Sequence, residues 1–291
     1  MGIDNNAVKL LFAAQAADVS FRQTLTLGRQ NFFPNANTLQ DLFGLFRIER
    51  DGGAFLAESK GYAEEFFKLL GADEVVAIDR SGYEGAAIVA DLNTPIDGSL
   101  KNRFTAIFDG GCLEHVFNFP QAIRNCMEML TVGGHFIAVT PANNFCGHGF
   151  YQFSPELFFR IFSADNGFAI RAILTKEKEN WYRVVDPAEA GRRVELQNTR
   201  PTYLFILAQK TTAKDPFTHA PQQSDYRKRW EEDASGSDLS RASRTGRRLR
   251  DFVPLQLKER LRPLYVNLPI RFRSKYYVKI KEARLLSGDF S

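Results

Sequence analysis

Short apolar runs alternate with amphipathic segments along the first 210 residues of the chain. Apolar runs bounded by turn residues predict five β-strands, at residues 21–27, 74–78, 86–90, 104–108 and 135–140. Apolar residues spaced three to four apart predict helices among them, at residues 39–48, 62–70 and 120–130. A helix between two buried strands returns the chain to the same end of the sheet, so we expect these strands to be parallel.

The two ends of this pattern predict further elements. Residues 7–19 predict a packed helix, and residues 154–162 predict a helix with Ser154 as its N-cap and Pro155 as its first residue. Two later apolar runs, at residues 168–175 and 202–209, are joined by a polar stretch without a crossover helix, so we expect an antiparallel hairpin. The predicted fold is therefore α/β, a doubly wound sheet of about seven strands, mostly parallel with a final antiparallel strand pair.

Charge divides the chain into a mildly acidic body and a basic C-terminal part. Residues 1–210 carry 20 Lys and Arg against 24 Asp and Glu, whereas residues 211–291 carry 18 against 10. Residues 211–250 hold few large apolar residues, and apolar content returns from Phe252 onward. We therefore predict a domain at residues 1–210, a polar basic linker at residues 211–250 and a short helical C-terminal extension at residues 251–291.

Closely spaced arginines make the linker a candidate for contact with an anionic surface. They are Arg241, Arg244, Arg247, Arg248 and Arg250. The linker has no groove-reading motif and no array of stacking aromatics, so nucleic acid is not an expected partner. The alternative is a solvated tail without a partner.

Cysteine usage and the length of the apolar runs indicate a cytoplasmic protein. The three cysteines are odd in number and lack CxxC spacing, so we expect neither a disulfide framework nor a zinc site, and we predict no metal. No apolar run approaches the roughly 20 residues that a bilayer crossing needs, so no transmembrane segment is expected.

Glycine and acidic residues follow the predicted strands at their carboxyl ends, where open α/β sheets bind ligands. Gly28 would let the backbone approach an anionic group, although an ordinary turn also uses glycine. Asp79 could accept hydrogen bonds from both hydroxyls of a ribose, and the alternative is a solvated loop acid. The ribose role requires residues 31–61 to be an insertion, because Gly28 and Asp79 are 51 residues apart. Asp91 could accept a bond from an adenine amine or serve as a turn residue.

Two histidines lie in loops after later strands. His115 follows Glu114 beyond the fourth strand, and His148 lies between Gly147 and Gly149 beyond the fifth. Histidine titrates near neutral pH, so both residues are candidates for taking a proton from an acceptor. The alternatives are that His115 caps or packs the following helix, and that the aromatic residues around His148 belong to the core and not to a pocket.

Several segments, in this order along the chain, resemble the class I S-adenosylmethionine-dependent methyltransferases. They are VVAID (75–79), IVADL (88–92), FTAIFDGGCLEHV (104–116), LTVGGHFIAVTP (130–141) and FYQFSPELFFRIFSADNGF (150–168). The resemblance covers roughly residues 20–210 and implies a Rossmann-like sheet that binds S-adenosylmethionine at its carboxyl edge.

The resemblance also implies a role for each residue at this edge. The cofactor-binding residues would be Gly28, Asp79, Asp91, Leu92, Asp109 and Gly110. Gly28 would lie near the methionine part, Asp79 would hold the ribose, and Asp91 with Leu92 would frame the adenine. The stretch from Asp109 to Cys112, which includes Gly110, would line the sulfonium side.

The function that this resemblance implies is methyl transfer to a small-molecule acceptor, such as a sugar or a glycan precursor. His148, ahead of His115, would be the catalytic base. The family's glycine-rich first loop is reduced here to the sequence LGRQ (27–30), so the alternative is a catalytically inactive methyltransferase-like scaffold that has lost the cofactor. In the active case Arg29 would pair with the cofactor's carboxylate. A nicotinamide oxidoreductase is disfavoured because its glycine fingerprint is missing and because the late antiparallel pair fits methyltransferases better.

Overall fold

A nine-stranded sheet is the centre of the fold in the computed structural model, which describes residues 2–82, 84–234, 263–264, 268 and 274–291. The strand order is β11-β9-β8-β10-β7-β6-β2-β4-β5. The parallel strands are β2 (Gln23–Leu27), β4 (Glu74–Asp79), β5 (Ile88–Val89), β6 (Phe104–Asp109) and β7 (Leu130–Asn143). The antiparallel pairings involve β8 (Phe168–Glu177), β9 (Asn180–Val184), β10 (Thr202–Lys210) and β11 (Tyr277–Ile280). The predicted α/β, mostly parallel, doubly wound sheet is confirmed, with nine strands instead of about seven.

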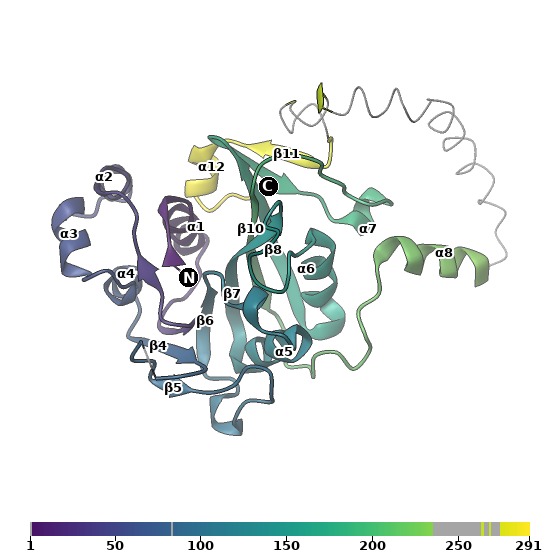
Figure 1. The fold of residues 1–291 in the computed structure, drawn as a ribbon, viewed down its shortest axis with the longest axis horizontal. Helices are drawn as coiled ribbons and strands as arrows, with labels where there is room; N and C mark the ends of the chain where they lie inside the picture. Colours follow the sequence, from purple (N-terminus) through teal and green to yellow (C-terminus); the bar gives the residue numbers. More distant parts are fainter. Residues whose placement is uncertain (1, 83, 235–262, 265–267, 269–273) are drawn as a thin grey trace.

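Helices cover both faces of the sheet, so the fold has three layers (Figure 1). One face carries α1 (Asn5–Ala16), α4 (Glu64–Leu69) and α12 (Glu282–Leu286), with α2 (Ala36–Leu45) and α3 (Gly52–Glu58) packed on the outside of this layer. The opposite face carries α5 (Phe119–Met129) and α6 (Pro155–Ile161).

Successive side chains of the central strands point alternately to the two faces of the sheet, so each face has its own hydrophobic core. Ile107 and Phe108 are neighbours in β6, yet Ile107 packs with α5 and α6 whereas Phe108 packs with the helices of the other face. Phe136 and Ile137 divide in the same way in β7. Successive side chains of a strand point to opposite faces, so a strand that is apolar throughout can supply both cores.

Residues 31–61 are more regular than the sequence analysis predicted. Asp51 is the N-cap of α3 and accepts a hydrogen bond from the amide of Ala54 at 2.7 Å, although the two glycines that follow it are more typical of a helix end. Asn35 caps α2 in the same way through the amide of Thr38, also at 2.7 Å. Two capped helices therefore lie in this segment, where the apolar spacing predicted one at residues 39–48.

The end of the sheet also differs from a simple hairpin. The predicted pairing of β8 with β10 is confirmed, but the polar stretch between them contains β9 and the short helix α7 (Pro187–Ala190). Strand β9 extends the sheet outward on the far side of β8, and β10 lies between β8 and β7.

The C-terminal part contributes to the sheet through β11, which the sequence analysis did not predict. Strand β11 pairs with β9, and α12 packs against α1. The predicted linker contains α8 (Ser224–Ala234), while its arginine cluster lies outside the described residues. None of the helices in the described ranges combines the length and hydrophobicity that a membrane crossing requires.

Candidate functional site

The strand order changes direction at β2, which lies between β6 and β4. The register places Leu27 of β2 opposite Ile78 of β4 on one side and Asp109 of β6 on the other. The residues that follow these strands therefore meet at one edge of the sheet. In doubly wound folds such a switch point is where a ligand crevice forms.

Gly28 makes the sharp turn that starts the first loop at this edge. Its φ of 69° is in the left-handed region that favours glycine, and its amide donates to the carbonyl oxygen of Ile78 at 2.7 Å. The next residue, Arg29, lies over the ring of Tyr62 at 3.6 Å and pairs with Glu64 at 2.6 Å. Arg29 is thus already engaged, and the structure gives no support to the expected contact with a cofactor carboxylate.

Gln30 is a residue of this edge that the sequence analysis missed. Its side-chain amide is buried and donates to the carbonyl oxygens of Leu27 and Gly28 at 2.7 and 3.2 Å, which braces the loop. Gly110 allows this approach, since a Cβ there would lie 2.2 Å from Oε1 of Gln30. The N-terminal strand β1 (Gly2–Ile3) also reaches this point, because the amide of Gly2 donates to the carbonyl oxygen of Gly110 at 3.2 Å.

The two acidic residues expected to hold an adenosine lie at this same edge. Asp79 is the last residue of β4 and pairs in parallel register with Val89 of β5, and Asp91 is two residues beyond Val89. Asp91 accepts hydrogen bonds from the amide and the side chain of Asn93, and these bonds lower the pKa of Asp91. Leu92 is buried in the core beneath, so its side chain supports this loop from below.

Two buried carboxyl groups follow β6. Asp109 accepts from the amides of Gly111 and Cys112 at 3.2 and 2.7 Å, and Glu114, in the short 3₁₀ helix η2 (Leu113–His115), is 1% exposed. Burial, and after it the charge of Glu114, raises the pKa of Asp109, and burial likewise raises the pKa of Glu114. Burial and the charge of Glu114 therefore both disfavour the ionised form of Asp109.

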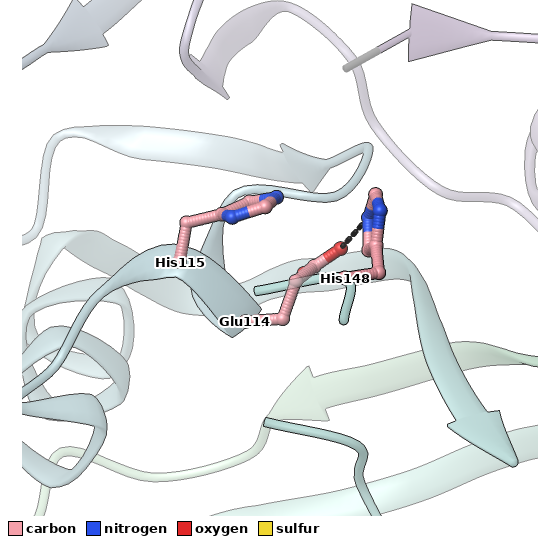
Figure 2. A group of neighbouring side chains, drawn as sticks. All are labelled: Glu114, His115 and His148. Carbon is pink, nitrogen blue, oxygen red and sulfur yellow. Dashed lines mark ion pairs between the residues drawn. The ribbon is translucent and has the colours of Figure 1, made fainter. Parts of the chain in front are cut away.

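The structure brings the two candidate catalytic histidines together with Glu114 (Figure 2). Nε2 of His148 lies 3.6 Å from Oε1 of Glu114, and the imidazole rings of His115 and His148 have centroids 5.0 Å apart. Both rings are open to solvent on one side, and burial, with the nearby His148, lowers the pKa of His115. These three side chains could take a proton from an acceptor or hold a divalent metal ion.

A cavity of about 300 Å³ lies beyond the end of β7 and is lined in part by Asn143 and Arg193. The side-chain amides of Asn143 and Asn144 both donate to the side-chain oxygen of Asn198, at 2.9 and 2.6 Å. These bonds tie the start of the His148 loop to the chain that lines the cavity. Its volume is in the range of small-molecule sites.

The residues at the switch point fit S-adenosylmethionine in two respects. Asp79 ends β4 at this edge, where its carboxylate could accept the hydroxyls of a ribose while its Oδ1 accepts from the amide of Ser81 at 3.1 Å. Oε1 of Gln30 and Oδ2 of Asp109 are buried acceptors, and neither has a hydrogen-bond partner among the described residues. An ammonium group such as that of a methionine end would supply the donors that both atoms need.

Comparisons with known proteins give a likeness of fold. No protein-family model matches the chain, and no curated protein matches it significantly. One solved structure that it resembles is a provisionally assigned methyltransferase of Bacillus halodurans, with 11% identity, a TM-score of 0.40 and coverage of 70% of this chain and 99% of that one. An S-adenosylmethionine-dependent methyltransferase of Mesorhizobium loti is 16% identical, with a TM-score of 0.36 and coverage of 68% and 95%.

A third structure is 1,6-didemethyltoxoflavin-N1-methyltransferase of Burkholderia thailandensis, bound to 1,6-didemethyltoxoflavin and S-adenosylhomocysteine. It is 16% identical, with a TM-score of 0.35 and coverage of 71% and 79%. Because all these TM-scores are below 0.5, the fold class rests on the strand order of the chain itself, and the site rests on its own geometry.

Proposed function

We propose that this protein transfers a methyl group from S-adenosylmethionine to a hydroxyl group of a small-molecule acceptor. The observation that carries the proposal is the arrangement at one edge of the sheet. The left-handed Gly28 and the carboxylates of Asp79 and Asp91 lie around the switch point, and the cluster of Glu114, His115 and His148 lies in the loops after β6 and β7.

The chain's own residues would hold the cofactor at both of its ends. Asp79 would accept hydrogen bonds from the ribose hydroxyls, and the Asp91 loop would border the adenine. Oε1 of Gln30 and Oδ2 of Asp109, which have no partner among the described residues, would accept hydrogen bonds from the amino group. When bound, the cofactor supplies a methyl group on a positively charged sulfur, so the main contribution of the protein is to position and align the acceptor.

A hydroxyl acceptor must also lose its proton, and we assign this task to the cluster around His148. Glu114 is buried and fixes one side of the cluster, whereas the exposed imidazoles face the space from which an acceptor would approach. Phe145 and Phe150 lie in the same loop, and Phe150 is largely exposed. Apolar ring faces beside a few polar groups suit a sugar or a glycan precursor as the acceptor.

The competing function is a scaffold that has lost the cofactor. Gln30 packs against Gly110, and Arg29 pairs with Glu64. Both side chains of the first loop are therefore engaged within the protein and not directed to a ligand, which favours this alternative. The two functions differ in whether the switch point binds an adenosine-containing ligand.

Isothermal titration with S-adenosylmethionine and S-adenosylhomocysteine separates the two functions. We expect micromolar binding by the full chain and a loss of about 10- to 100-fold in D79N, because a carboxylate's hydrogen bonds are worth about 1.5–3 kcal/mol. D97N is the matched control, since Asp97 only caps a short 3₁₀ helix through the amide of Ser99. Absence of binding at millimolar ligand, or equal binding by D79N, contradicts the proposal.

A further inference from the structure

Glu114, His115 and His148 present three metal-ligating atoms to one small space (Figure 2). One nitrogen from each imidazole and one carboxylate oxygen all lie within 4.8 Å of one another. The side chains come from two segments, η2 and the loop after β7, so neither segment forms the cluster alone.

The spacing is close to what a bound ion requires. Ligands at 2.0–2.2 Å from a tetrahedral zinc ion are roughly 3.3 Å apart. The pair of His148 Nε2 and Glu114 Oε1 is at 3.6 Å already, and the two exposed imidazoles can close the remaining gap by small rotations. The cluster therefore needs no backbone rearrangement to bind an ion.

The surroundings hold the cluster in place. Oε2 of Glu114 faces the hydroxyl of Thr140 at 3.5 Å, which leaves Oε1 toward the histidines. The exposed side of the rings leaves coordination positions open, as in catalytic sites with three protein ligands.

We propose that Glu114, His115 and His148 form a binding site for a divalent first-row transition metal ion, with Zn²⁺ as the reference ion. Two imidazoles and one carboxylate are a ligand set that zinc accepts, and no thiolate takes part. Whether the cluster binds metal does not depend on the proposed function, but the catalytic consequence of a bound ion does. With metal bound, the nitrogens that bind it no longer accept the proton of the acceptor, and the ion takes over the role that the proposed function gives to His148. An acceptor hydroxyl that reaches the open side of the ion would become more acidic and would release its proton to solvent, and the oxygen would then attack the methyl carbon as the carbon–sulfur bond breaks.

Metal titration of the full chain tests the site directly. Zn²⁺ is titrated into chelator-treated protein in competition with a chromophoric chelator, in a C146S background because Cys146 is an exposed free thiol. We expect one ion per chain, with affinity reduced at least about 10-fold in H115A and in H148A. H219A is the matched control, because His219 is an exposed histidine outside the cluster.

The outcomes are distinct for the metal site and for the proposed function. E114Q should also weaken Zn²⁺ binding. Because Glu114 is buried, circular dichroism is used to check that the E114Q variant is folded. If E114Q unfolds, H115A still tests the site, because His115 is exposed. The proposed site is overturned if Zn²⁺ affinity is unchanged in H115A and H148A. It is also overturned if the wild type binds no Zn²⁺ at 100 µM, a concentration that corresponds to a binding free energy of about 5.5 kcal/mol. S-adenosylhomocysteine binding measured on the same samples tests the cofactor site alone, so one proposal can fail while the other stands.

Discussion

The amide of Phe150 donates a 2.7 Å hydrogen bond to the carbonyl oxygen of Glu114. The amide of Tyr151 donates to the same oxygen at 3.2 Å. The loop after β7 is therefore fastened to the backbone of η2, directly beside the side chain that faces His148. The placement of His148 over Glu114 depends on this backbone contact as well as on the 3.6 Å approach of their side chains.

Gly149 makes this contact sterically feasible. Its φ is 70°, and a Cβ there would lie 2.7 Å from the carbonyl oxygen of Glu114. We predict that G149A destabilises the fold by about 1–3 kcal/mol and lowers Zn²⁺ affinity about 10-fold or more, because the loop must move away from η2. The matched control is G147A, where φ is also positive at 92° but a Cβ would meet nothing within 4 Å. Equal metal affinity in the two variants would show that the loop contact does not position His148.

Gln30 should contribute to cofactor binding although no sequence motif marks it. Its amide braces the first loop, and its oxygen is one of the two orphan acceptors at the switch point. We predict that Q30A weakens S-adenosylhomocysteine binding about 10-fold, the worth of about one hydrogen bond, in isothermal titration. Q209A is the control, since Gln209 makes one exposed bond to Gly133. Tighter binding by Q30A would mean instead that Gln30 obstructs the crevice.

The buried imidazole of His135 should make the fold less stable in acid. It is buried on β7, its Nδ1 has no partner among the described residues, and burial, followed by the charge of Arg171, lowers its pKa to about 4. Below pH 6.5 the unfolded chain binds a proton that the folded chain rejects, so stability falls as the pH drops from about 6.5 toward 4. We predict that, between pH 7 and pH 4, the free energy of unfolding of H135Q falls by roughly 2 kcal/mol less than that of the wild type. Urea midpoints at the two pH values measure this, and parallel losses in both proteins would refute it.

The C-terminal residues should stabilise the domain despite their separation from it along the chain. Leu285 of α12 is fully buried in the core that contains α1. We predict that L285A lowers the free energy of unfolding by about 2–5 kcal/mol. Val278 of β11 is 39% exposed, and V278A should change the free energy of unfolding by no more than about 0.5 kcal/mol. Chemical denaturation of both variants decides whether α12 belongs to the cooperative unit.

The parallel half of the sheet could be predicted because each strand is a local apolar run. Strand β6 and the middle of β7 are buried on both faces, so their apolar runs are nearly uninterrupted and easy to locate. Strand β4 has the apolar run VVAI, and β2 is marked by alternating leucines and threonines before Gly28. Strand β11 could not be predicted in this way, because its ends are buried while its middle is exposed, and it pairs with β9 from far along the chain. Helix α3 was missed because its two opening glycines are more typical of a helix end, whereas Asp51 is the cap that starts it.

The site was predictable where a residue's position along a strand determines its place. Gly28 and Asp91 follow strands and Asp79 is the last residue of one, so strand order alone brings them to one edge. Gln30 has no such marker, because its burial depends on the close approach of Gly110. The absence of CxxC spacing led us to predict no metal, and the proposed site uses histidines that only the contact between η2 and the β7 loop brings together.

A crystal structure of the full chain with S-adenosylhomocysteine would show whether the switch point binds the cofactor. We expect the ribose hydroxyls within hydrogen-bond distance of Asp79, the adenine beside the Asp91 loop, and the amino group against Oε1 of Gln30 or Oδ2 of Asp109. A ligand bound at another edge of the sheet, or a switch point that stays closed by Gln30 and empty at saturating ligand, would contradict this expectation.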